Sequence, residues 1–170
     1  METTKEFIQT VLEDLQRNLD TVFDGLTPAE AAWQPSDSLN SIGLILFHTA
    51  RSEDFFIQEL VRGQSQVWEK DNWFERCKFP KEERGRHYTA EQVKAFVPPD
   101  ITLIKAYNAS VRAHTLDYLA GLTIEEYNRV VTTSRGERPV AGFLSNIITH
   151  AAQHTGEICY LRGLQRGLNK

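Results

Sequence analysis

Two histidines one helical turn apart are the residues of this chain whose spacing points most directly to metal chemistry. They are His150 and His154, with Ala-Ala-Gln between them. Side chains four apart on a helix share one face, with Cβ atoms about 5–6 Å apart. Two imidazoles placed in this way can converge on one ion through Zn–N bonds of about 2.0–2.1 Å. Such a pair also arises by chance, so its meaning depends on its surroundings and on a third ligand.

The last helix expected in the chain carries this pair. It should begin near Pro139, because proline suits a first helical turn, and should end at about Gly163 or Leu168. Steps of three and four residues along it pass through both histidines and through a core-facing stripe of Phe143, Ile147, Ala151, Ile158 and Leu161. An unpaired buried polar group costs roughly 1–3 kcal/mol, so two imidazoles on this stripe favour a shared ligand.

His48 is the candidate for a third ligand. It stands in the apolar segment LILFHTA, on the same helical face as Ile45 and Phe55. If this helix touches the last one, His48 can face His150 and His154. Three histidines leave one tetrahedral position open, as in catalytic rather than structural zinc sites. Four small residues near the pair should permit close helix approach and leave room for a water or a substrate: Ala151, Ala152, Thr155 and Gly156.

Other polar residues compete for a place in this site. His114 lies on a helix whose inner face is ambiguous, and a surface or hydrogen-bonded core position is the favoured reading. His87, in the charged stretch RGRHYT, is expected to be solvated. Glu157 follows His154 by one turn and is equally consistent with orienting its imidazole or with a plain helix surface. Because residue 151 is alanine, the glutamate of an HExxH metalloprotease is absent.

The two cysteines do not add ligands. Cys77 and Cys159 match no CxxC pattern, and Cys159 lies about 140° round the helix from His154 at 3.6 residues per turn. We therefore expect free thiols in a reducing cytoplasm.

Composition limits the classes of partner. A length of 170 residues indicates one domain, residues 1–170, with a single core. A net charge of −4 and a pI near 5.7 argue against a nucleic-acid binder that relies on phosphate contacts. No apolar run approaches the roughly 18 residues of a membrane span, and the start of the chain lacks the apolar region of a signal peptide. We expect a cytoplasmic protein that acts on a small molecule.

The hydrophobic period is helical along most of the chain. Apolar residues recur at steps of three and four from Phe7 to Phe23, and a second long helix should run from about Leu39 to Arg62 and end at Gly63. A third should run from about Asp100 to Ala120.

The connections between these helices carry their own signals. Capping-box patterns open short helices at 27–30 and 89–92, and Thr123 to Glu126 caps a further turn. Residues 64–88 lack a clean period and should pack on the bundle and cover one end, whereas TTSRGERP reads as a loop. No strand is predicted. The expected fold is all-α, a four-helix bundle with short extra helices in the connections.

Two segments resemble the DinB/YfiT-like proteins of bacteria. They are LILFHTARSEDFF, with a histidine in the apolar second helix, and THAAQHTGEICYLRGL, with H-x3-H followed by small residues and Leu-Arg. The resemblance extends over the whole chain in length and helix number. It implies a four-helix bundle that holds one divalent metal, zinc or nickel, through His48, His150 and His154, and it implies a homodimer.

The function implied by this resemblance is that of a metal-dependent enzyme. Some branches of the family are S-transferases that use a low-molecular-weight thiol such as bacillithiol or mycothiol, and a metal-dependent hydrolase is a related reading. The alternative is a non-catalytic metal-binding or stress-response module. Trp68, Trp73 and Phe74, in one irregular stretch, suggest apolar surface that a second subunit would cover.

Overall fold

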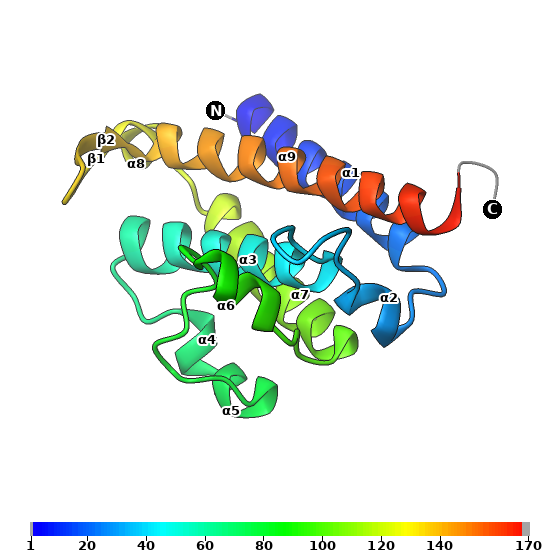
Figure 1. Cartoon of the computed structure of the whole chain (residues 1–170). Helices are drawn as coiled ribbons and strands as arrows, with labels where there is room; N and C mark the ends of the chain where they lie inside the picture. The colour runs from blue at the N-terminus through cyan, green and yellow to red at the C-terminus, as the bar shows by residue number, and fades with distance from the viewer. Residues whose placement is uncertain (1, 168–170) are drawn as a thin grey trace.

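Four long helical segments pack around one another in the computed structural model, which describes residues 2–167. The segments are α1 (Glu2–Phe23), α3 (Ile42–Asp54) continued by η1 (Phe55–Val61), α7 (Ile101–Ala120) and α9 (Val140–Arg166). α1 packs on α9, α9 on α3, α3 on α7 and α7 on α1. Figure 1 shows α1 and α9 side by side, above α3 and α7. The predicted all-α class is confirmed.

The helix ends follow the capping signals of the sequence. Thr27 and Glu30 form a reciprocal capping box at α2 (Pro28–Ala32), and Thr89 and Gln92 form another at α6 (Ala90–Ala95). At Gly63 the backbone has φ +62°, a left-handed conformation that glycine adopts without a steric penalty, and η1 has ended two residues earlier. These ends were predicted because each depends on residues within one helical turn.

The sequence predicted one uniform second long helix, but the structure shows a change of helix type within it. It begins at Ile42, with Ser41 as its N-cap, and it changes to π-helical geometry from Phe55 to Val61. A π-helix bonds each N–H five residues back and therefore rotates the side chains that follow relative to an α-helix. Four consecutive polar side chains are buried just before this change, Arg51 to Asp54.

The segment between η1 and α6 packs on the bundle, as expected. It forms α4 (Val67–Lys70) and α5 (Trp73–Cys77), which contact α7. The expectation that Trp68 and Trp73 form exposed apolar surface is wrong, because their exposed fractions are only 0% and 4%. They belong to one core cluster with Phe47 of α3 and Tyr107 of α7, and Phe74 packs partly buried against the same cluster. This stretch therefore gives no support to a homodimer.

The stretch predicted as a loop after α8 (Ile124–Asn128) is a small β-hairpin. β1 (Val130–Thr133) and β2 (Gly136–Pro139) pair antiparallel, with Val131 opposite Arg138. Only Val131 of these strands is buried among the described residues, so no alternating pattern marked them in the sequence. In Figure 1 the hairpin lies at the end of the molecule where α9 begins. Within residues 2–167, no helix combines the length and apolar character needed to cross a bilayer.

Candidate metal centre

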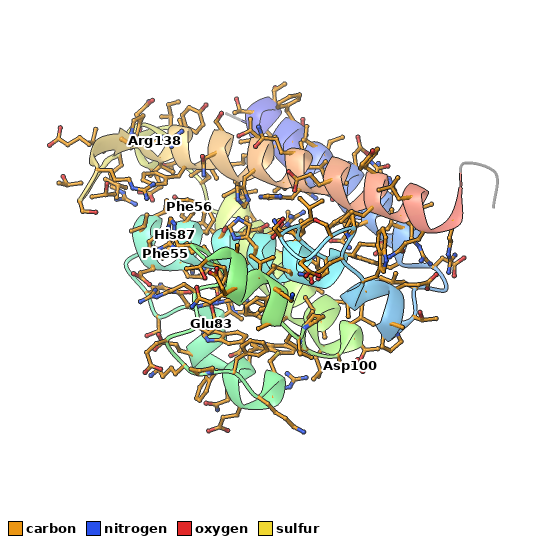
Figure 2. The ribbon with its side chains drawn as sticks, viewed as in Figure 1. Phe55, Phe56, Glu83, His87, Asp100 and Arg138 are labelled. Atoms are coloured by element: carbon orange, nitrogen blue, oxygen red, sulfur yellow. The ribbon has the colours of Figure 1, made fainter. Side chains whose placement is uncertain are left out.

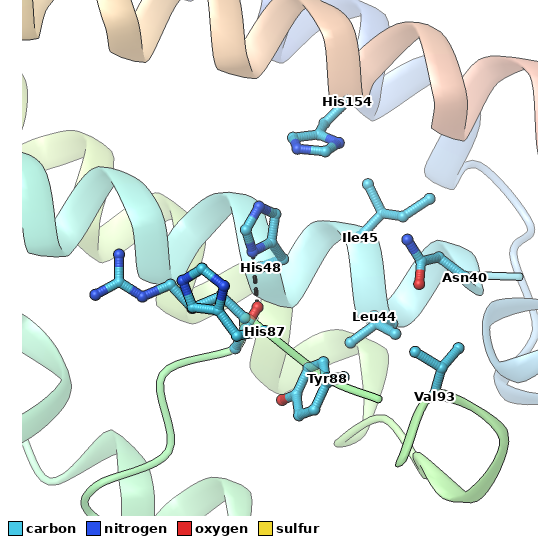
Figure 3. Close-up of a pocket in the computed structure, with 10 residues that line it drawn as sticks. Asn40, Leu44, Ile45, His48, His87, Tyr88, Val93 and His154 are labelled. Carbon is cyan, nitrogen blue, oxygen red and sulfur yellow. Dashed lines mark hydrogen bonds between the residues drawn. The ribbon is translucent and has the colours of Figure 1, made fainter. Parts of the chain in front are cut away.

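Three histidines from two helices meet at the contact between α3 and α9. The Nε2 atom of His150 lies 3.0 Å from Nε2 of His48 and 3.2 Å from Nε2 of His154. Candidate ligand atoms of all three residues lie within 4.8 Å of one another. Figure 3 shows His48 on α3 and His154 on α9 facing each other. The tertiary structure therefore brings together the three residues that the sequence nominated.

The α9 pair lies at the edge of the buried stripe, not inside it. Ala151 and Thr155 are buried against the neighbouring helices, whereas His150 and His154 are half-buried. The expectation of core histidines is corrected accordingly. Ala152 and Gly156, expected to leave room beside the site, are exposed. An edge position has a functional consequence, because the ring nitrogens stay within reach of a ligand that arrives from solvent.

The hydrogen bonds of the Nδ1 atoms determine whether each Nε2 atom offers a lone pair or a hydrogen to the centre of the cluster. Nδ1 of His48 lies 2.7 Å from the carbonyl oxygen of Gly85, and Nδ1 of His154 lies 2.8 Å from Oε2 of Glu157. Both partners only accept, so each Nδ1 carries the hydrogen. In a neutral imidazole the Nε2 atom then has a free lone pair.

The three Nε2 atoms therefore converge with fewer N–H donors than are needed to pair every lone pair. His150 Nε2 faces two lone pairs and can donate a hydrogen to only one of them. A divalent cation, in contrast, accepts all three lone pairs at once. In metal-binding histidines, the ring nitrogen that does not bind the metal usually donates a hydrogen bond to the protein. The donor set of this site thus fits a metal ion. Glu157, for which two roles were open, contacts His154 and is placed to orient it.

The electrostatics of the site also favour neutral imidazoles. Burial lowers the pKa of His150 to about 4, and the charges of His154 and His48 act in the same direction. Burial likewise lowers the pKa of His48, against the opposing effect of its bond to Gly85. A neutral imidazole is the form that binds a metal, so the site keeps its ligands available at neutral pH.

A loop that sequence reasoning did not connect with the site holds His48 in place. The carboxylate of Glu83 accepts hydrogen bonds from the Gly85 amide and from the Tyr88 hydroxyl, each at 2.8 Å. Arg51, one turn after His48 on α3, donates to the Glu83 carbonyl through Nε at 3.1 Å and Nη2 at 3.0 Å. The loop is therefore fixed to the same helix as the imidazole that it orients.

Gly85 is confined at this point by geometry. Its φ is +66°, and a Cβ there would lie 3.1 Å from Cγ of Arg51 and 3.3 Å from Phe47. A side chain at residue 85 would thus strain the backbone and push the loop away from α3. No signal in the sequence links this carbonyl to His48, because every residue has a backbone carbonyl.

A cavity of about 250 Å³ opens beside His48 and His154. The α3 side contributes Asn40, Leu44 and Ile45, and the loop contributes Gly85 to Tyr88. Figure 3 shows His87 and Tyr88 on the loop side of this space. A small molecule in the cavity would lie next to two of the three histidines.

The other candidates lie outside the cluster. His87 lines the cavity but is exposed, in agreement with its predicted solvation. His114 bonds the Ser110 carbonyl at 2.9 Å through Nδ1 and is not part of the histidine group. Cys77 and Cys159 are both free thiols, and neither belongs to that group.

Comparison with known proteins places this arrangement in a family. No curated protein matches the chain. The crystal structure of a conserved protein from Enterococcus faecalis has a similar fold, with a TM-score of 0.82 and 24% identity over 94% of this chain and 95% of that one. The model of the DinB superfamily matches residues 12–158, a range that includes all three histidines. This chain therefore belongs to the DinB superfamily.

Proposed function

We propose that the protein is a metal-dependent enzyme whose centre is one divalent ion held by His48, His150 and His154. The observation that carries the proposal is the convergence of three Nε2 atoms, two of them with their lone pairs fixed inward by Gly85 and Glu157. Imidazole ligands suit zinc and nickel, the two ions that the family resemblance suggests.

The protein side chains have distinct tasks in this proposal. His150 and His154 come from one helix and define one side of the site, while His48 closes it from α3. Three protein ligands leave a coordination position for a substrate or a water. The metal, when bound there, acidifies a water or a thiol that coordinates it. The adjacent cavity of about 250 Å³ orients the rest of a small substrate.

Two reaction classes agree with this arrangement. One is transfer to or from a low-molecular-weight thiol, and the other is hydrolysis of a small molecule. The cavity beside the histidines supports both, because either reaction needs access from solvent to the ion. A non-catalytic metal-binding module is the alternative, and it requires a site that small ligands cannot enter.

Metal analysis of protein purified without a histidine tag tests the proposal. Wild type is expected to hold about one divalent ion per chain, and the His150→Ala, His154→Ala double variant none. In cobalt-substituted protein the visible spectrum should shift when azide or a small thiol is added, because the open position admits them. Full metal content in the double variant would refute the assignment. A cobalt spectrum indifferent to every small ligand would favour the binding module.

We further propose that the protein is a homodimer, on the basis of the family resemblance alone, and that it is cytoplasmic, on the basis of its free thiols. Sedimentation at micromolar concentration should therefore show a species of about twice the 19.4 kDa chain mass. A 19.4 kDa species alone would overturn this part of the proposal without affecting the metal centre.

A further inference from the structure

A second cavity, of about 440 Å³, lies at the end of the molecule where the hairpin meets η1 and α9. Three arginines and three phenylalanines dominate its lining: Arg86, Arg135, Arg138, Phe55, Phe56 and Phe143. Figure 2 shows Phe55 and Phe56 on η1 and Arg138 on the hairpin at this same end. The cavity thus combines positive charge with aromatic surface.

This space adjoins the histidine cluster. Arg86 lines both cavities, the one beside His48 and the one under the hairpin. Asn146 also lines the second cavity and precedes His150 on α9 by one turn. A molecule bound in the second cavity would therefore lie one helical turn from a metal ligand.

The positive charge of the cavity is largely unpaired in the part of the chain that the structure describes. Within residues 2–167, none of Arg86, Arg135 and Arg138 forms an ion pair, and Glu137 is the one acidic residue among those that line the cavity. Burial, together with the charges of Arg84 and Arg135, lowers the pKa of Arg86 from its ordinary value, against the opposing effect of the Glu59 charge. A chain with a net charge of −4 thus gathers like positive charges at one point beside its proposed active centre. An anion would relieve their mutual repulsion.

The arginines are also held in place for recognition. The guanidinium carbon of Arg86 lies 4.4 Å from the centre of the Phe55 ring, and that of Arg138 lies 5.5 Å from the Phe143 ring. Arg138 lies along the bare backbone of Gly142, where a Cβ would fall 2.5 Å from its Nε. Guanidinium groups stacked on rings leave their N–H edges free, and these edges match carboxylate and phosphate oxygens.

We propose that this cavity is the subsite for the anionic group of the substrate, a carboxylate or a phosphate on a partly apolar small molecule. The assignment rests on the proposed function, because it assumes that the other end of the same ligand reaches the metal centre. The phenylalanines bury the apolar part, and Arg86 and Arg138 bind the anion.

Calorimetric titration of the metal-loaded protein tests the subsite directly. The probes are phenyl phosphate, benzoate and uncharged benzyl alcohol, which separate the two anions from each other and from the ring alone. At least one anion should bind about tenfold or more tightly than benzyl alcohol. The Arg86→Gln, Arg138→Gln double variant should lose at least about tenfold in that affinity. Arg17→Gln, which removes a charge from the exposed face of α1, is the control and should not change it.

Two further measurements separate the subsite from the metal centre. The His150→Ala protein should still bind the anion, because the arginines do not depend on the ion. In cobalt-substituted protein, 6-mercaptohexanoate should perturb the spectrum at a concentration at least about tenfold lower than 6-mercapto-1-hexanol, and the arginine variant should remove that difference. Anion affinity that is equal in wild type and arginine variant, or that disappears with His150 alone, would overturn the subsite. Arginine-dependent binding in a protein that never holds metal would overturn the proposed function and leave the subsite standing.

Discussion

Two polar clusters are built around helix α3, and they differ in whether their hydrogen-bond donors and acceptors pair within the cluster. The first is the histidine cluster around His48. The second, which we call the Arg51 network, consists of Arg51, Asp54, Gln66 and Tyr107, with exposed fractions of 3%, 0%, 2% and 0%. In the network, donors and acceptors match. In the histidine cluster, three nitrogens of the same kind face one another.

The bonds of the network show how complete it is. Arg51 Nη1 donates to Gln66 at 2.7 Å and to Tyr107 at 3.0 Å, and Tyr107 donates to Asp54 at 2.7 Å. Asp54 also accepts hydrogen bonds from the amides of Val67 and Trp68, both at 2.9 Å, and from Arg51 Nη1 at 3.4 Å. Burial raises the pKa of Asp54, and these hydrogen bonds and Arg51 oppose that shift.

The difference indicates the role of each cluster. A self-satisfied network in a dry core contributes to the stability and the specificity of packing, and it needs no ligand. Lone pairs that face one another repel, and a shared proton or a cation removes that repulsion. We therefore expect mutations in the network to affect folding and mutations in the histidine cluster to affect metal binding. The following predictions test this separation.

The largest effect is expected from Asp54→Ala. It removes the carboxylate that accepts from Tyr107 and two amides and leaves the charge of Arg51 buried without its partner. Breaking a buried pair on one side costs about 3–5 kcal/mol. Urea denaturation of the metal-free protein measures the loss. A loss below about 1 kcal/mol would show that the network does not stabilise the fold.

Metal removal should have a smaller, concentration-dependent effect. Metal-free wild type should stay helical, because the four packed helices do not depend on the ion. The bound ion adds RT ln(1 + [L]/Kd), about 2.7 kcal/mol at 100 times Kd. The melting temperature should therefore fall on chelation in wild type and stay constant in the His150→Ala, His154→Ala double variant. Loss of helicity on chelation, followed by circular dichroism, would mean that the histidine cluster is structural.

Gly85→Ala should weaken metal binding through the loop that links the two clusters. The added Cβ meets Arg51 and forces the carbonyl away from His48. Loss of such a supporting contact typically costs about 10–100-fold in metal affinity. Competition with a chromophoric chelator measures it. Gly63→Ala is the matched control, because its φ is +62° and its Cβ would have no neighbour within 4 Å. Equal affinities in the two variants would contradict a role for the loop.

The smallest effect is expected at the half-buried cluster around Glu30, whose charges are paired within the protein. Its bonds to the backbone and side chain of Thr27, and then to Arg162 and Arg166, lower its pKa to about 2. A lowered pKa in the folded state means a stabilising contribution that is present above about pH 4.5 and is lost as the pH falls toward 2. The difference in melting temperature between wild type and Glu30→Gln should shrink over this range. A difference that is constant from pH 6 to 3 would contradict the shift.

Sequence reasoning succeeded wherever one helical turn contained the information. The capping boxes at Thr27 and Thr89 depend on a residue three positions away, and both formed. His150 and His154 were paired for the same reason, since four residues are one turn of a helix. Their partner His48 was nominated from its apolar surroundings, but 102 residues separate it from His150, and only the packing of α3 on α9 joined them.

The amino-acid sequence by itself determined the helical class, the main helix boundaries and the identity of the three histidines, because periodicity, caps and i,i+4 spacing act locally. Tertiary structure alone decided the rest. It selected the Gly85 carbonyl as the partner of His48, buried Trp68 and Trp73, and brought Arg86 to both cavities. Neither a backbone carbonyl nor a change from α-helix to π-helix is marked by a distinctive residue type. The burial of a tryptophan depends on residues that are distant in the sequence. Such features follow from how the helices pack, and local patterns do not encode them.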